Sequence, residues 1–405
     1  MDILINVLTI AVLGQELVIL LKSIFTLRYI SKYRKSQYSH FSNANKGTNI
    51  FLVIPVHEVQ TVFLESLAHF VQFSSVVNQI IFVIDNPNLL KNVHVSERVT
   101  ILIDENKNST KTTKLKLAQD SLKHCVDKTN SYIGVYDVDA RPSEEVFQWI
   151  ITDLEKRKKN PAVYQSIPVY LEAGKLTKRI VKQYYQFHIR RSLGVEGVTL
   201  LQNNLKSIQY LMGSGMFINL QVLSNVGGFP KLSDDIELGY KLAFSREKEV
   251  ILPFLSPVDY VNTYRDMIRQ HMRINYGTLS ILNVYKQYDS TVQGNGIVIK
   301  LFIDALLEIW ELLFITIIIA YGIVDDNMFP TMVLVTALFM IEHTHNLLFQ
   351  VVRYHKMKKL MNVFQLCMST FNYPILYAVR LFSMISFYIL KNSIKHVFRK
   401  NTTKE

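Results

Sequence analysis

Cysteine is scarce in this 405-residue sequence, which contains only Cys125 and Cys367. The two lie far apart and match neither a zinc-binding nor a redox spacing, so the sequence predicts no disulfide framework and no zinc site, as expected for a reducing compartment. A Gly-rich phosphate loop and a G-x-G-x-x-G segment are also lacking, which excludes the main parts of Walker-type and Rossmann dinucleotide chemistry. No internal repeat or low-complexity segment is evident.

The charge is unbalanced, because acidic residues are fewer than basic ones and the net charge is +12. Aromatic RNP strands and paired metal-ligand fingers are absent, so this charge does not indicate nucleic-acid binding. The basic residues cluster beside apolar segments and in the stretch KRKK at 156–159. We therefore expect contact with anionic membrane lipids, which the high hydrophobic content of 49% also favours.

A long apolar run near the start predicts a retained membrane anchor. The segment from Ile3 to Phe25 is long enough to span a bilayer, lacks a basic region before it and offers no small-residue cleavage site, so residues 1–27 are assigned to a transmembrane helix. Basic residues follow, with no acidic residue between Glu16 and Glu58. The positive-inside rule therefore places the next domain in the cytoplasm of a multi-pass membrane protein.

The C-terminal third, residues 301–392, predicts further transmembrane and interfacial helices. Apolar stretches that end near Val324 and run from Phe329 to Val352 are typical of a helical hairpin with a basic cytoplasmic return loop. Polar residues interrupt the next apolar segment, at about 363–390, so a span and a tilted, re-entrant or interfacial helix both stay open there. The remaining assignments are an interfacial helix or linker at 278–300 and a basic cytoplasmic tail at 393–405.

Two groups of polar residues fall within these apolar stretches. Each is spaced to share one helical face, and ionisable groups in a span usually face a bundle interior or an aqueous path, which suits an acceptor route. For the first group, the headgroup zone is an equally good location. The groups are Asp304, Glu308 and Glu311, and Glu342, His345 and Asn346.

Between the membrane segments, residues 48–277 show the rhythm of an α/β domain. Short apolar strands at 50–55, 79–85, 99–104 and 132–139 each finish in a polar loop before a helical pattern. Ligands of such sheets bind at the carboxyl ends of the strands. We therefore expect one sheet edge to collect five polar side chains: His57, Glu58, Asp85, Asp137 and Asp139.

Asp137 and Asp139 form a D-x-D pair at the end of an apolar strand. Two carboxylates in such a place are costly unless a cation lies between them, and a divalent metal is the obvious candidate. A metal-held nucleotide diphosphate would also explain the missing Gly-rich loop, because the cation would neutralise the leaving group. Taken alone, D-x-D is a weak signal, since a solvated acidic turn has the same appearance.

The stretch from Leu211 to Phe244 strengthens this interpretation. Gly213, Ser214 and Gly215 form a small-residue segment that a substrate could approach closely. Ser233 is expected to cap a helix that starts with the acidic sequence DDIEL. Capping accounts for one acid there but not for three, and a carboxylate at a helix start inside a cleft is a good general base for a hydroxyl.

Taken in their order along the chain, the strand ends, the D-x-D pair, the small-residue segment and the DDIEL helix start resemble the family 2 glycosyltransferases. These are the membrane-bound, inverting, nucleotide-sugar-dependent type, and the resemblance covers roughly residues 50–277. The resemblance implies a GT-A fold, which is a Rossmann-like nucleotide-sugar-binding α/β domain, flanked here by transmembrane α-helices. It implies that Asp139 and Asp137 hold Mg²⁺ or Mn²⁺ and that Asp235, beside Asp234, is the catalytic base. The donor-binding positions that it implies are Pro55, Glu58, Asp85, Lys114, Asp137, Gly213, Ser214 and Gly215.

The last element of the family, Q-x-x-R-W, is only partly present. Gln270 and Arg273 match it, and the arginine would contact the diphosphate, but Ile274 replaces the tryptophan that stacks under the acceptor sugar in processive synthases. Losing that platform weakens the case for a long sugar polymer as acceptor. A solvated helix at the membrane surface would also explain Gln270 and Arg273.

The sequence thus predicts a metal-dependent membrane glycosyltransferase that takes a sugar from a cytoplasmic nucleotide-diphospho-sugar, with UDP-linked donors favoured by the resemblance. The acceptor would be a glycan or a glycolipid in cell-envelope or capsular polysaccharide synthesis in the plasma membrane of a bacterium. One alternative is transfer of a single sugar to a polyprenyl phosphate carrier. The alternative of another class is an inactive membrane scaffold or transporter subunit, against which the retained acids argue.

Overall fold

The computed structural model describes most of the chain, in segments separated by gaps. Residue 299 is also described, and the segments are 2–37, 47–57, 60–90, 97–106, 109–123, 127–172, 188–190, 192–197, 206–208, 210–230, 234–259, 263–287, 313–325 and 328–357. The region at 363–390, the acidic group at 304–311, the tail at 393–405 and, within 278–300, residues 288–298 and 300 therefore lie outside the described residues.

An eight-stranded mixed sheet organises the central domain, in the order β3-β2-β1-β4-β7-β5-β8-β6. β1 pairs in parallel with β2 and β4, and β2 pairs in parallel with β3, whereas β7 is antiparallel to β4 and β5. The four strands expected from the sequence are confirmed. The strands are β1 (Asn49–Pro55), β2 (Gln79–Ile84), β3 (Val99–Ile103), β4 (Ser131–Val135), β5 (Val163–Glu172), β6 (Lys206–Ser207), β7 (Met216–Asn219) and β8 (Lys248–Asp259).

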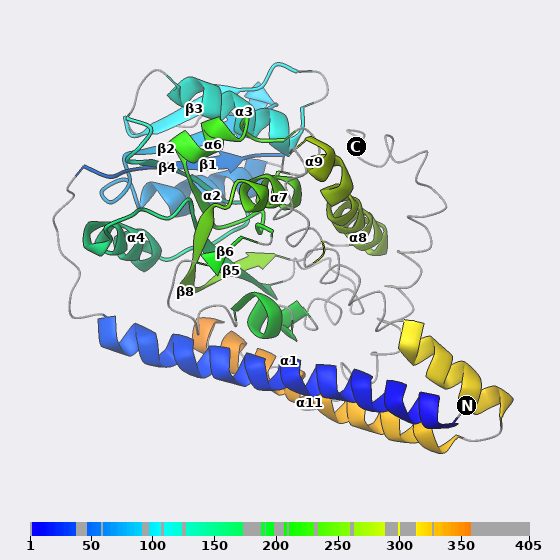
Figure 1. Cartoon of the computed structure of the whole chain (residues 1–405). Helices are drawn as coiled ribbons and strands as arrows, with labels where there is room; N and C mark the ends of the chain where they lie inside the picture. Colours follow the sequence, from blue (N-terminus) through cyan, green and yellow to red (C-terminus); the bar gives the residue numbers. More distant parts are fainter. Residues whose placement is uncertain are drawn as a thin grey trace.

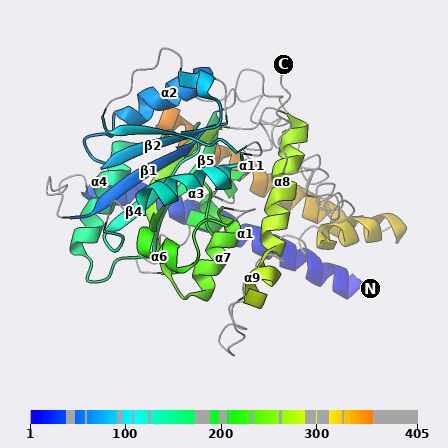
Figure 2. The ribbon, with the colours of Figure 1, turned by 90° about the horizontal axis from the view of Figure 1, so that it is seen from above.

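Helices cover both faces of the sheet, so its central strands are apolar on both sides (Figures 1 and 2). α2 (Gln60–Val71) and α4 (Glu144–Lys156) pack on one face. The opposite face carries α3 (Lys111–Leu122), α6 (Leu220–Asn225), α7 (Ile236–Phe244) and α9 (Ile281–Gln287), and α8 (Tyr264–Leu279) precedes α9. A short 3-10 turn, η1 (Pro87–Leu90), follows β2.

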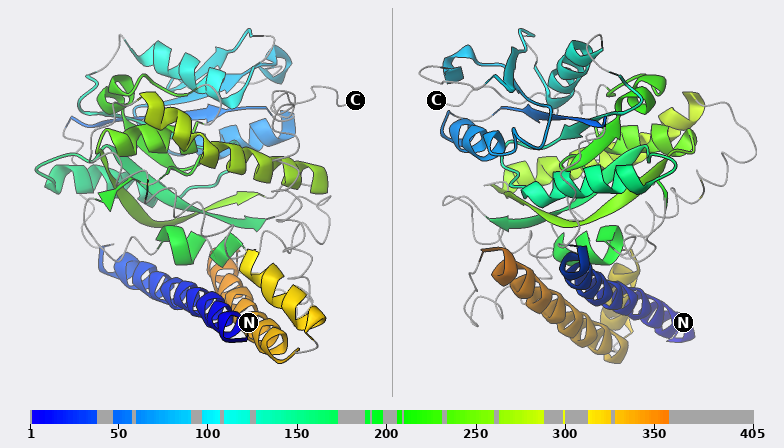
Figure 3. Two further views of the ribbon diagram at one scale, coloured as in Figure 1. Left: turned by 45° about the vertical axis from the view of Figure 1, so that its right-hand side comes forward. Right: turned by 90° about the vertical axis from the view of Figure 1, so that its left-hand side faces the viewer.

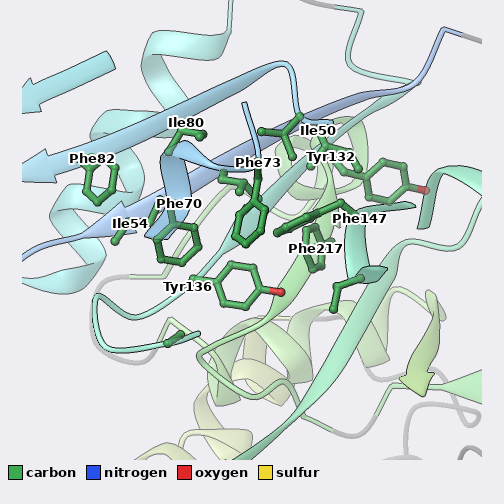
Figure 4. Packing of buried hydrophobic residues seen from close by; sticks show 14 of the residues in the cluster. Ile50, Ile54, Phe70, Phe73, Ile80, Phe82, Tyr132, Tyr136, Phe147 and Phe217 are labelled. Atoms are coloured by element: carbon green, nitrogen blue, oxygen red, sulfur yellow. The ribbon is translucent and has the colours of Figure 1, made fainter. Parts of the chain in front are cut away.

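Aromatic rings fill the first of these two interfaces (Figure 4). Phe70 of α2 lies 5.7 Å from Tyr136, between ring centroids, and Tyr136 in turn lies 5.7 Å from Phe217 of β7. Phe147 of α4 lies 4.9 Å from Phe73, two residues after the end of α2, between ring centroids. Such buried rings contribute more than their area, and here they anchor the strand end that carries the D-x-D pair.

Three apolar helices lie beside one another under the domain (Figures 1 and 3). They are α1 (Asp2–Gln37), the helix Leu313–Val324 and α11 (Phe329–Met357). Ile5 of α1 packs in a cluster with Leu334 near the start of α11, and Ile30 packs in a cluster with Phe349 near its end, so α1 and α11 run in the same direction. Both are long and apolar enough to cross a membrane.

α1 extends ten residues beyond the expected boundary at residue 27, and its last part is covered by the domain. Ile30 lies in one buried cluster with Ile167 and Val169 of β5 and Leu255 of β8. The close approach continues at η2 (Ser192–Glu196), where a Cβ on Gly194 would lie 2.6 Å from Ile19 Cγ2. The domain therefore sits directly on α1.

Candidate active site

Three of the side chains expected at one sheet edge follow the carboxyl ends of parallel strands, as predicted. His57 follows β1, Asp85 follows β2, and Asp137 comes two residues after β4. The parallel pairing brings them to the same edge. Pro55 is the last residue of β1, and Glu58 lies outside the described residues.

A buried ammonium holds the first part of this edge. Lys114 of α3 is 0% exposed, and its Nζ lies 2.9 Å from Asp85 Oδ2 and 2.8 Å from His57 Nδ1 while donating to the Val56 carbonyl. Burial alone would raise the pKa of Asp85, but the hydrogen bond and charge of Lys114 outweigh it, so this pKa is lowered. Lys114 therefore fixes Asp85, which is 30% exposed, as an ionised acceptor.

The small-residue segment at Gly213 to Gly215 is tied to the same edge. Gly215 has φ +73° and donates its N–H to the Val135 carbonyl at 2.7 Å, while its own carbonyl accepts from Ser166 N at 2.8 Å. Ser214 Oγ accepts from Asp137 N at 3.3 Å. The segment thus lies against the end of β4, beside the first aspartate of the D-x-D pair.

Lys111, which no sequence motif singled out, is at the centre of the site. Its Nζ donates to Asp137 Oδ1 at 2.7 Å and to the Gly213 carbonyl at 2.7 Å, and lies 3.1 Å from Asp234 Oδ2. Burial would lower the pKa of Lys111, but Asp137 and Asp234 raise it, so the ammonium stays charged. One cation therefore joins the D-x-D pair, the small-residue segment and the acids before α7.

Asp235, and not Ser233, is the N-cap of α7, because its Oδ1 accepts from Ile236 N at 2.7 Å. The sequence placed the cap at Ser233, which lies outside the described residues, and the N-cap in the structure is Asp235. Asp235 Oδ2 faces Gly213, since a Cβ on that glycine would lie 2.9 Å from it. Burial raises the pKa of Asp234 to about 6, with Lys111 opposing the shift and Asp235 adding to it.

The D-x-D turn offers oxygen ligands of the kind that Mg²⁺ and Mn²⁺ prefer. Ala140 N donates to the Asp137 carbonyl at 3.0 Å and closes the turn, and Arg141 N donates to the Pro257 carbonyl of β8 at 3.1 Å. Among the described residues, no three His, Cys, Asp or Glu side chains lie close enough to hold a metal. Asp137 is in contact with a cation in the structure, the ammonium of Lys111.

The partial Q-x-x-R-W element lies on α8. Gln270 Nε2 is 3.5 Å from the Tyr170 hydroxyl of β5, and Arg273 is exposed. Ile274, at the tryptophan position, packs against the core on the side of α7 and α9. Tyr170, whose ring centroid lies 5.3 Å from that of His188, is the aromatic residue that the structure brings to Gln270, and sequence order alone did not reveal it.

The second polar group of the apolar stretches is buried, as a shared face requires. Glu342, His345 and Asn346 of α11 are at most 7% exposed, and His345 Nε2 lies 3.5 Å from Ser23 Oγ of α1. A buried ion pair joins Glu16 of α1 to Arg190 of the domain. These contacts place the group between the helices, next to the domain.

No protein-family model matches the sequence, and no curated protein does. Among solved structures, the chain is similar to the mannosyltransferase PcManGT from Pyrobaculum calidifontis, determined in complex with GDP-Man and Mn²⁺. The TM-score is 0.56 at 11% sequence identity, over 95% of this chain and 99% of that chain. At this identity the likeness shows a fold shared with a glycosyltransferase, and the chemistry has to be argued from the residues.

Proposed function

We propose that the chain is a membrane-attached, inverting glycosyltransferase of the GT-A type, similar to family 2, that uses a nucleotide-diphospho-sugar. The observation that carries the proposal is the meeting of Asp137, Asp234 and the Gly213 carbonyl on the Lys111 ammonium, with Asp235 facing Gly213. A leaving group and an attacking hydroxyl need cation-binding and proton-accepting carboxylates within one small site.

Each part of the site has a role in this reaction. Asp85 would bind the nucleoside, because Lys114 and His57 hold it at the sheet edge beside Asp137. Asp137 and Asp139 would hold Mg²⁺ or Mn²⁺, which would neutralise charge on the departing diphosphate. The neighbour with GDP-Man and Mn²⁺ supports both the donor class and the metal. The sequence resemblance favours a UDP-linked donor, so both nucleotides have to be tested.

Asp235 would accept the proton of the acceptor hydroxyl, since its cap to Ile236 uses one oxygen and fixes the direction of the other. A single displacement would invert the anomeric carbon. Arg273, exposed on α8, would stabilise the diphosphate as it leaves, and Gln270 would hold Tyr170 on the acceptor side. If the acceptor were a phosphate, it would already be ionised, so transfer to it would not need Asp235 as a general base.

The membrane part of the proposal rests on exposed apolar surface. Ile3 is 81% exposed, Ile10 70%, Phe329 73% and Met332 64%, on two helices long enough to span. Water is a poor solvent for such a surface, whereas lipid is a good one. A glycan or lipid-linked acceptor at the cytoplasmic face of a plasma membrane would fit this arrangement.

The test is nucleotide diphosphate release from UDP- and GDP-sugars by the full chain in nanodiscs, with and without Mn²⁺ and native lipid extract. We expect metal-dependent release from one donor, which Asp235→Asn abolishes and Asp120→Asn, a control in an exposed pair on α3, leaves unchanged. Release that persists in Asp235→Asn with a polyprenyl phosphate acceptor would support transfer to that carrier. Absence of both turnover and metal-dependent nucleotide binding would refute the proposal in favour of a scaffold.

A further inference from the structure

The N-terminal cap of α3 fixes the backbone position of Lys111. Thr110 caps α3 through a reciprocal pair with Thr113, in which Thr113 N and Thr110 N each donate to the partner hydroxyl, at 3.2 and 2.9 Å. Thr113 Oγ1 also donates to Asp104 Oδ2 at 2.7 Å, which ties the helix start to the end of β3. Lys111 is the first residue after this cap, so its side chain starts from a fixed point at the sheet edge.

The surroundings of the ammonium are those of a cation site. It contacts one oxygen of Asp137, one of Asp234 and the Gly213 carbonyl, and its side chain is 26% exposed. Asp234 Oδ2 is buried and accepts no hydrogen bond of good geometry among the described residues, so the ion pair with Lys111 is what compensates its charge there. Without the ammonium, Asp137 of the D-x-D pair and Asp234 before α7 would face one another with no cation between them.

We propose that Lys111 is a built-in cation that occupies Asp137 in the absence of donor and competes there with the divalent metal, so that metal and nucleotide diphosphate bind together. This inference rests on the proposed function, and it assigns a role to a residue outside the motifs that suggested that function. A second cation at Asp137 would be repelled by the ammonium at short range. The negative charge of a diphosphate offsets this repulsion, which makes metal and nucleotide affinities reciprocally coupled.

A lysine that competes with the metal and a lysine that only holds the site together predict different effects when Lys111 is replaced. A structural lysine that is lost weakens the site, and metal affinity falls together with nucleotide affinity. A competing lysine that is lost leaves the acids of the site without their cation, so metal affinity in the absence of nucleotide rises while nucleotide affinity does not. The sign of one measured change therefore decides between the two roles.

The experiment measures Mn²⁺ binding to the full chain in nanodiscs by EPR of free Mn²⁺, with and without UDP or GDP, for wild type, Lys111→Met and Lys116→Met. Lys116 is exposed on the same helix and serves as the matched control. For wild type we expect at least tenfold tighter Mn²⁺ binding when the preferred nucleotide is present. For Lys111→Met we expect at least tenfold tighter Mn²⁺ binding than wild type without nucleotide, and a smaller effect of nucleotide.

Two further variants cover a fold defect in Lys111→Met. Lys111→Gln removes the charge but keeps a donor for the Gly213 carbonyl, so its Mn²⁺ affinity should also rise, whereas Lys111→Arg keeps the charge and should retain the weak affinity. Folded Lys111→Gln with unchanged or weaker Mn²⁺ binding would overturn the inference. If wild type shows no metal-dependent nucleotide binding at all, the proposed function itself fails, which is a different outcome.

Discussion

Gly215 offers the sharpest test of how the site is built. Its φ of +73° lies in the left-handed region, and a Cβ added there would meet Ser166 Oγ at 1.8 Å and Ser166 Cβ at 3.1 Å. The same residue joins β4 to β5 through its N–H and its carbonyl, next to Ser214 and Asp137. Gly215→Ala therefore adds both backbone strain and a steric clash at the donor-binding edge.

The two contributions can be separated, because Gly227 has φ +86° with nothing within 4 Å of its Cβ position. Gly227→Ala should cost only the left-handed strain, about 1 kcal/mol. Gly215→Ala should cost that strain plus overpacking, about 2–5 kcal/mol in total. At about 2–4 °C per kcal/mol, the second variant should lower the melting temperature several times further than the first.

The assay is thermal unfolding of both variants, together with Mn²⁺-dependent nucleotide binding, which Gly215→Ala should weaken and Gly227→Ala should not. Ser166→Gly removes the atoms that the new methyl group meets, so a double-mutant cycle should show that it recovers at least about 1 kcal/mol of the loss. Equal destabilisation by the two alanine substitutions, or a cycle without coupling, would refute the geometry on which the site rests.

Three charged groups give further predictions. Because the pKa of Asp234 is raised to about 6, its contribution to stability is nearly full below about pH 4 and is lost as the pH rises through 6, so thermal scans from pH 4 to 7 should show wild type losing about 2 kcal/mol more than Asp234→Asn. Lys114→Met should cost about 3 kcal/mol on denaturant unfolding and weaken nucleotide binding, because Asp85 loses its buried partner; unchanged stability would contradict this. Glu16→Gln should lower stability in nanodiscs by about 3 kcal/mol, and adding Arg190→Met should restore most of it; no recovery would show that the pair does not act as a unit.

Strands β1 to β4, which pair in parallel, could be predicted because they read as short apolar runs, and β1, β2 and β4 are buried on both faces. From that topology, the meeting of His57, Asp85 and Asp137 at one edge follows without any motif. β5 and β8 were not predicted, since Pro168, Pro253 and Pro257 interrupt them, and proline argues against a strand. β5 lies between β7 and β8 all the same, with a register shift between Gln165 and Ile167.

The choice between Lys111 and Lys114 shows where sequence patterns stop. The two are three residues apart and so share a helical face, and motif order singled out Lys114. In the structure Lys114 is fully buried against Asp85, while Lys111 reaches Asp137 and Asp234. Which of the two faces the substrate side depends on how α3 docks on the sheet, and that depends on tertiary contacts that no local pattern contains.

β5 and β8 link the apolar helices to the acid edge. Ile167 and Val169 of β5 and Leu255 of β8 pack with Ile30 of α1. Tyr170 follows on β5, in register with Val258 of β8, and its hydroxyl lies 3.5 Å from Gln270 Nε2 of α8. A domain on a loose tether would not need the buried Glu16–Arg190 pair or the close approach at Gly194. These contacts therefore fix the position of the sheet, which carries the D-x-D turn, relative to α1.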